Sequence, residues 1–148
     1  MEIRKTKHQL RLNGITRNNR EKVYTFDVYT IEGFNFKEGK LTCLSIKDEQ
    51  AGLYMFSHRY SILNVDFYCH DLLYLGKADN LQERPFNLKH DKFKDLAKTK
   101  CNAICIYQCS DTEDPKSIES NILNYYNFRF NEQENEDDGC KLTTAAED

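Results

Sequence analysis

The sequence contains no tryptophan, only two prolines and six glycines, and no long apolar run. So few glycines and prolines exclude extended low-complexity segments. A transmembrane helix needs about 20 consecutive apolar residues, and a secretion signal needs an apolar core near its start; the sequence has neither. A chain of 148 residues, 39% of them hydrophobic, is large enough for one packed core. We therefore expect one globular domain, a cytoplasmic location and no membrane partner.

The six cysteines include no CxxC pair, the spacing most typical of a zinc site. Cys101, Cys105 and Cys109 recur every four residues, but they surround a segment with the composition of a strand. Without a secretion signal, disulfides are not expected. We interpret the cysteines as free thiols that behave as small buried apolar side chains, with a zinc cluster as the alternative.

The net charge of −3 conceals an uneven distribution. Residues 132–148 hold seven acidic residues and one lysine, a charge of −6, so the rest of the chain carries +3. Residues 1–22 hold seven basic and two acidic residues, a charge of +5. A basic segment of this kind can bind phosphate, and the acidic segment is expected to be a disordered tail. A solvated arm without a ligand is an equally good interpretation of the basic segment.

Several segments have the alternation or the aromatic and β-branched composition of strands. Residues 23–31 alternate between apolar and polar side chains, which predicts a strand with one buried face. Residues 51–56 and 71–76 are apolar, aromatic-rich runs on either side of a long polar and aromatic connection, which predicts a hairpin with an enlarged loop. The other two strand candidates are residues 41–46 and 102–108.

Three helices are expected after the hairpin. Asp114 and Pro115 form a strong helix start, because aspartate caps the first turn and proline fits its first position. This helix should continue to about Tyr126. Shorter helices are expected over residues 79–84 and from about residue 91.

Glu119 is an anomaly of the helix that starts at Asp114. At about 100° per residue it falls inside the apolar arc, between Tyr126 and Leu123. A carboxylate that faces the packed side destabilises the fold by several kcal/mol unless it is paired or bound to a metal. The sequence therefore predicts a partner for Glu119, either an arginine or a metal ion.

Two motifs lie in the predicted hairpin: Gly-Leu-Tyr at 52–54 and Tyr-Leu-Gly at 74–76. They resemble the paired signatures of the GIY-YIG endonuclease family. The run at 74–84, Tyr-Leu-Gly-Lys-Ala-Asp-Asn-Leu-Gln-Glu-Arg, is similar to the YxGKAxxLxxR stretch in the N-terminal nuclease domain of the bacterial excision-repair nuclease. Glu119 on a helix and Asn131 after Phe-Arg-Phe follow in the family's order.

This resemblance implies an α+β fold, a small and largely antiparallel mixed sheet flanked by helices. We expect the nuclease core to cover residues 51–131. Residues 1–50 would form a basic N-terminal extension with strands, and residues 132–148 an acidic, disordered tail.

The resemblance also implies the chemistry. Glu119 corresponds to the family's metal ligand and would hold Mg²⁺ or Mn²⁺, because magnesium prefers oxygen ligands and often uses one or two carboxylates. Arg84 corresponds to the arginine that binds phosphate oxygens through paired donors. Lys77 is expected at the phosphate as well. His90 is a further nucleic-acid-binding candidate, although its offset from Arg84 departs from the family's usual spacing.

A tyrosine is the family's proposed general base or water-positioning group. Tyr54 and Tyr74 both match, and the sequence does not distinguish them. A phenol with a pKa near 10 needs nearby positive charge to deprotonate, which Lys77, Arg84 or the metal would supply. Asn131 corresponds to the late asparagine and would orient the site or a ligand.

The leading hypothesis is a metal-dependent DNA endonuclease that acts on double-stranded DNA, either as one copy or as a homodimer. One alternative is a nucleic-acid-binding protein that resembles the family and has lost turnover, since the chain's net charge is modest and Pro85 disturbs the segment after Arg84. Another is a protein-interaction module that uses the basic arm or the acidic tail.

Overall fold

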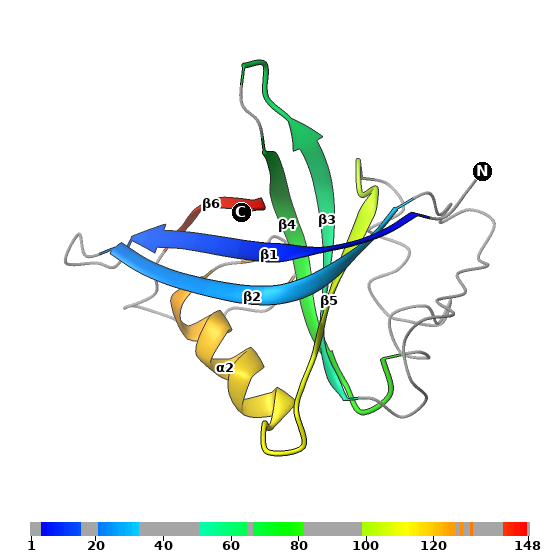
Figure 1. Ribbon diagram of the computed structural model, residues 1–148. Coiled ribbons are helices and arrows are strands. Elements are labelled where there is room, and N and C mark those ends of the chain that lie inside the picture. Colours follow the sequence, from blue (N-terminus) through cyan, green and yellow to red (C-terminus); the bar gives the residue numbers. More distant parts are fainter. Residues whose placement is uncertain are drawn as a thin grey trace.

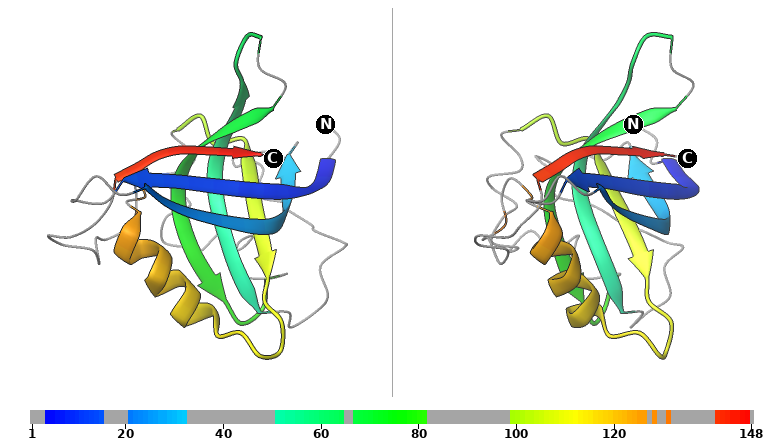
Figure 2. Two further views of the ribbon diagram at one scale, coloured as in Figure 1. Left: turned by 60° about the vertical axis from the view of Figure 1, so that its left-hand side comes forward. Right: turned by 90° about the vertical axis from the view of Figure 1, so that its left-hand side faces the viewer.

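The computed structural model describes residues 4–15, 21–32, 51–64, 67–81, 99–126, 128, 131 and 141–147. Within these ranges, six strands form a closed barrel with the order β1-β2-β5-β3-β4-β6, and every strand pair is antiparallel (Figures 1 and 2). One helix, α2, packs against β4 and β3. The elements are β1 (Arg4–Ile15), β2 (Glu21–Glu32), β3 (Gly52–Ser61), β4 (Tyr68–Ala78), β5 (Ala103–Gln108), α2 (Pro115–Tyr125) and β6 (Lys141–Glu147).

The expected fold class, an α+β sheet flanked by helices, is wrong. Strands from both ends of the chain join the central three strands in one ring. β2 pairs with β5 along Tyr29↔Ile106, and β1 continues the sheet beyond β2. β6 pairs with β1 on one side and with β4 on the other, and so closes the ring. These pairings occupy the sheet edges that an open, helix-flanked sheet would leave exposed.

β6 lies in the segment that the sequence assigned to a disordered acidic tail. Residues 141–147 instead pair with β1, in a register that includes Leu12↔Ala145. The strand's own pattern, Lys-Leu-Thr-Thr-Ala-Ala-Glu, contains little apolar surface and follows a run of acids. Its partner β1 supplies the buried leucines at this position, Leu10 and Leu12, so the pairing depends on a strand at the opposite end of the chain.

The predicted hairpin is confirmed, but its arms are longer than expected. β3 and β4 continue through most of the polar segment that was expected to be a loop, with pairs such as His58↔Asp71 and Arg59↔His70. Asn64, with φ of 68°, lies in the turn. The hairpin end projects beyond the barrel in Figure 1. It carries the exposed side chains of Tyr60, Ile62, Leu63, Phe67 and Tyr68.

Three further predicted elements are confirmed: the strand over residues 23–31 lies within β2, the strand over 102–108 is β5, and the helix after Asp114 is α2. Asp114 caps the helix, because its carboxylate accepts from the Lys116 amide at 3.2 Å and the Ser117 hydroxyl at 2.9 Å. The expected strand at 41–46 and the helix from residue 91 lie outside the described residues, as does most of the expected helix at 79–84.

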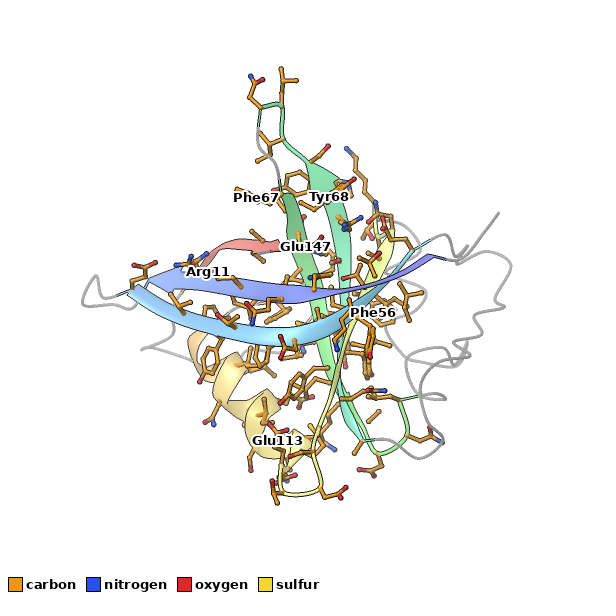
Figure 3. All side chains as sticks on the ribbon, in the orientation of Figure 1. Arg11, Phe56, Phe67, Tyr68, Glu113 and Glu147 are labelled. Carbon is orange, nitrogen blue, oxygen red and sulfur yellow. The ribbon has the colours of Figure 1, made fainter. Side chains whose placement is uncertain are left out.

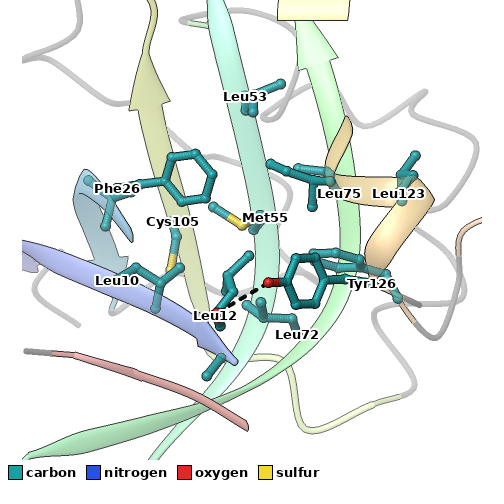
Figure 4. Close-up of a cluster of buried hydrophobic side chains, with 14 residues drawn as sticks. Leu10, Leu12, Phe26, Leu53, Met55, Leu72, Leu75, Cys105, Leu123 and Tyr126 are labelled. Atoms are coloured by element: carbon teal, nitrogen blue, oxygen red, sulfur yellow. Dashed lines mark hydrogen bonds between the residues drawn. The ribbon is translucent and has the colours of Figure 1, made fainter. Parts of the chain in front are cut away.

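Two groups of buried side chains lie on the two faces of β3, β4 and β5. Figure 4 shows the first, where α2 packs onto the sheet and the Tyr126 hydroxyl donates to the Leu12 carbonyl at 3.4 Å. Its members include Leu12, Phe26, Leu53, Met55, Leu75, Ile122, Leu123 and Tyr126. The second group includes Ile31, Tyr54, Phe56, Leu73, Ala78, Leu81, Ile104 and Ile106.

Replacing Gly76 with alanine should destabilise the barrel by about 1–3 kcal/mol, because overfilled cores force side chains from their preferred positions. Gly76 pairs with Tyr54, and a Cβ built on Gly76 would overlap the Tyr54 ring, which is only 1% exposed. Urea unfolding measures the change. Lys77→Ala is the control, because it changes the next residue, whose side chain is exposed. Its free energy of unfolding should stay within about 0.5 kcal/mol of wild type. Equal midpoints for the two variants would contradict the packing argument.

Candidate functional site

The two signature motifs pair directly with each other. Tyr54 of β3 lies opposite Gly76 of β4, and Phe56 lies opposite Tyr74. The rings of Tyr54 and Tyr74 are 6.2 Å apart between centroids. Gly76 has no side chain, so the Tyr54 ring can lie over its backbone. The structure therefore places both candidate tyrosines on one face of the hairpin.

The two tyrosines differ in exposure. Tyr54 belongs to the buried core and is 1% exposed, whereas Tyr74 is half-buried at the edge of the same cluster. Of the two tyrosines, therefore, only Tyr74 has a side chain that is appreciably exposed to solvent. The distinction was not available from the sequence, because both residues occupy equivalent positions in their motifs.

Asn131 is held against β4 beside Tyr74. Its side-chain oxygen accepts from the Leu75 amide and its side-chain nitrogen donates to the Leu75 carbonyl, both at 2.8 Å. These are the bonds that a neighbouring strand would make, so Asn131 covers part of the β4 edge. The expected site asparagine and tyrosine thus lie next to each other.

Lys77 and Glu119 lie on the other side of the sheet. Lys77 is exposed and pairs across the strands with Leu53, whose side chain belongs to the cluster that packs on α2. Glu119 lies on α2 and is half-buried. Tyr54 and Tyr74 belong to the opposite face, so the sheet separates the two tyrosines from Lys77 and Glu119. Arg84 and His90 lie outside the described residues.

A second polar cluster, which sequence reasoning missed, is buried inside the barrel. It consists of His8 on β1, His70 on β4 and Glu147 at the end of β6. The His70 Nε2 atom lies 2.8 Å from the Glu147 Oε2 atom, and the His8 Nε2 atom lies 3.5 Å from Glu147 Oε1. Figure 3 labels Glu147 where β6 approaches the β3–β4 hairpin that carries Tyr68.

Arg59 of β3 completes the charge balance around Glu147. Its guanidinium donates through Nε to Oε2 at 2.5 Å and through Nη2 to Oε1 at 2.9 Å, while Nη1 donates to Glu32 at 2.6 Å. The guanidinium also lies 3.5 Å from the centre of the Tyr68 ring. Asn102 fixes the Arg59 backbone by bonding its amide at 2.6 Å and its carbonyl at 2.9 Å.

These contacts shift the ionisation of the cluster. Burial alone would raise the pKa of Glu147, but the bonds from Arg59 and His70 lower it to about 2. Burial alone would lower the pKa of His70, but the neighbouring Cys105 and Glu147 raise it. Burial lowers the pKa of His8. At neutral pH the cluster therefore combines an ionised carboxylate with one neutral imidazole, that of His8.

Ser57, His70 and Glu147 contain the side-chain types of a hydrolytic triad. The Ser57 hydroxyl lies 2.9 Å from His70 Nδ1, on the opposite side of the ring from Glu147. Ser57 is 0% exposed and His70 is 4% exposed. A nucleophile needs access to its substrate, so this arrangement is structural in the closed barrel.

The cluster had no signature in the sequence, because its members come from three distant strands and follow no spacing rule. Among the described residues it is the one group of histidine, cysteine and acidic side chains with metal-binding geometry. Cys69, Cys101, Cys105 and Cys109 are free thiols, and all of them except the half-buried Cys101 have the buried position expected of small apolar side chains.

Among the described residues, no helix has the length and apolar character needed to cross a membrane. No protein-family model matches the chain, and neither the curated proteins nor the solved structures include a match to it.

Proposed function

We propose that the protein is a metal-dependent endonuclease that hydrolyses phosphodiester bonds of double-stranded DNA. The observation that carries the proposal is the direct pairing of the two signature motifs, Tyr54 opposite Gly76, with the side chain of Asn131 bound to the backbone of Leu75 between Tyr74 and Gly76. The pairing and these bonds bring Asn131 to the stretch of β4 that carries Tyr74, which supports the resemblance to the GIY-YIG nucleases.

Tyr74 is the general base or water-positioning group in this proposal. Its half-buried side chain reaches solvent, whereas Tyr54 lies in the core with its hydroxyl end against Gly76. Proton transfer requires the base to come within hydrogen-bond reach of the attacking water. Tyr54 instead has a packing role that supports the pairing of β3 with β4.

Glu119 is the proposed ligand of Mg²⁺ or Mn²⁺. Glu119 is a half-buried residue in the middle of a helix that packs against β4, and its carboxylate fits an ion that retains most of its waters and takes one protein oxygen. When bound, the ion would supply charge neutralisation at the phosphate and an activated water. Lys77 and Arg84 would bind phosphate oxygens, and Asn131 is a positioning residue that holds the chain beside Tyr74.

Nicking of supercoiled plasmid by the purified protein tests this proposal. We expect nicking with Mg²⁺ or Mn²⁺ and none in a chelator. Tyr74→Phe should lower the single-turnover rate by about 10²–10⁴-fold, the usual contribution of a general base. Tyr54→Phe removes the same atom from the buried ring and should change the rate less than about tenfold. The opposite ranking would assign the base to Tyr54, and equal, unreduced rates would exclude both.

The arrangement around β4 also favours a second candidate, a DNA-binding protein without turnover. Tyr74 and the helix that carries Glu119 lie on opposite faces of the sheet, so catalysis requires their side chains to meet around the β4 edge. This candidate predicts DNA binding in a mobility-shift assay with no nicking in either metal. Lys77→Ala should weaken binding under both proposals, so cleavage, not affinity, decides between them.

A further inference from the structure

The cluster of His8, His70 and Glu147 has the composition of a metal site. It offers two imidazole nitrogens and one carboxylate oxygen, and the three ligand atoms lie within 4.8 Å of one another. Two histidines with one carboxylate are a common ligand set for zinc and related divalent transition metals, whereas magnesium and calcium prefer oxygen ligands. The chemistry therefore differs from that proposed for Glu119.

Both imidazoles are oriented as metal ligands usually are. A ligating histidine typically bonds through its second ring nitrogen to a fixed group, which sets the direction of the first. His8 Nδ1 donates to the Gln9 carbonyl at 3.1 Å, and His70 Nδ1 is hydrogen-bonded to the Ser57 hydroxyl at 2.9 Å. The Nε2 atoms of both rings consequently point towards Glu147. The Thr30 hydroxyl, also hydrogen-bonded to His8 Nε2, is a further oxygen at this place.

The carboxylate is held from its other side. Arg59 donates one bond to each oxygen of Glu147, which fixes the plane of the carboxylate. A carboxylate has about four acceptor positions, so Arg59 uses two of them and two remain towards the histidines. Hydrogen-bonded carboxylates of this kind are common among metal ligands.

One of the two histidine–carboxylate distances already matches a zinc site, and the other is shorter. Two ligands of a tetrahedral zinc ion, each about 2.0–2.2 Å from the metal, lie roughly 3.3 Å apart. His8 Nε2 and Glu147 Oε1 are 3.5 Å apart, which matches this spacing. His70 Nε2 and Glu147 Oε2 are 2.8 Å apart, the length of a hydrogen bond. Binding would replace the proton between them, release it to solvent and lengthen this contact by roughly half an ångström.

We propose that His8, His70 and Glu147 bind one zinc-type divalent ion inside the barrel, where it joins β1, β4 and β6. Its role is structural, because His70 is almost fully buried and a protein group is bonded to the far side of each ligand: the Gln9 carbonyl on His8, the Ser57 hydroxyl on His70 and the Arg59 guanidinium on Glu147. Among the described residues, β4 and β6 pair at Cys69↔Ala146. An ion bound next to this pair would strengthen the contact between the two strands that close the barrel. The site does not depend on the proposed nuclease activity.

Calorimetric titration of the chelator-treated full chain with Zn²⁺, in the presence of excess Mg²⁺, tests the proposal. We expect one equivalent of zinc to bind and the thermal unfolding midpoint to rise with zinc concentration. Absence of stoichiometric binding to the folded wild-type chain would overturn the proposal. Plasmid nicking is measured separately, so a failed zinc site and a failed nuclease proposal give different results.

Variants locate the bound ion. His8→Gln and His70→Gln should each weaken zinc binding by at least about 100-fold, since loss of an outer contact alone commonly costs 10–100-fold. His58→Gln is the matched control, because this histidine of β3 lies outside the cluster and stacks on Tyr60. Circular dichroism checks that each variant folds. His8 is less buried than His70, so His8→Gln remains informative if His70→Gln is unfolded. Unchanged zinc affinity in folded His8→Gln would place the ion elsewhere and overturn the proposal.

Discussion

Replacement of Arg59 with alanine is expected to lower the free energy of unfolding by about 3–5 kcal/mol, the range for breaking a buried ion pair by removing one partner. The Arg59 side chain joins Glu147 of β6 to Glu32 of β2, and all three side chains are largely buried. Without the Arg59 guanidinium, the largely buried carboxylates of Glu147 and Glu32 lose the positive charge that pairs with them. Since small domains are stable by only about 5–15 kcal/mol, urea unfolding should show a large shift of the midpoint.

Two comparisons identify the cause of that loss. Arg11→Ala removes an exposed arginine from β1 and should change stability by less than about 0.5 kcal/mol. Arg59→Met with Glu147→Met and Glu32→Met removes all three charges, and should recover much of the stability lost in Arg59→Ala, because buried ion pairs are often replaceable by apolar groups. If Arg59→Ala were no more harmful than Arg11→Ala, the cluster would contribute little to barrel closure.

Replacement of Glu119 with glutamine is expected to lower metal-dependent nicking by roughly 10³-fold. Glutamine keeps the size of the side chain but removes the negative charge that attracts the divalent ion. Metal stabilisation of a transition state is worth several kcal/mol, and about 4 kcal/mol corresponds to a thousandfold change in rate. Single-turnover nicking with Mg²⁺ and with Mn²⁺ measures the effect.

Glu113 offers a matched control for Glu119. It precedes the same helix, and its carboxylate accepts from the Tyr107 hydroxyl at 2.5 Å and from the Ser110 amide at 2.9 Å (Figure 3). Glu113→Gln should therefore leave the nicking rate within about threefold of wild type, which corresponds to a change in activation free energy under ~0.7 kcal/mol. The Glu113 carboxylate is already bonded within its own loop and has no proposed contact with the metal ion. Full activity in folded Glu119→Gln would refute the proposed metal ligand.

Local patterns predicted the elements that depend on local chemistry. The cap at Asp114 with Pro115 fixed the start of α2, and alternation in residues 23–31 identified β2. The apolar, aromatic-rich runs at 51–56 and 71–76 predicted a hairpin, because each strand carries its own apolar pattern. In each case a few neighbouring residues contain the information.

Closure of the barrel could not be predicted in this way. Residues 141–147 include few apolar residues, and they pair with β1 through contacts such as Leu10↔Glu147 and Leu12↔Ala145, which join positions more than 130 residues apart. The cluster of His8, His70 and Glu147 depends on the same long-range pairing. The sequence also left Tyr54 and Tyr74 as equivalent candidates. Their different exposure is decided by how β3 and β4 pack against the second core group, which no local pattern contains.

The pairing of the first strand with the last has a consequence for how the chain folds. Contacts as distant as Leu10↔Glu147 form late, because a large loop must close before they stabilise the chain, and folds dominated by such contacts acquire their structure slowly. Until β6 arrives, β1 and the upper part of β4 present unpaired backbone amides and carbonyls. Those edges are templates for another chain, so aggregation during refolding should start there, and not at the finished barrel.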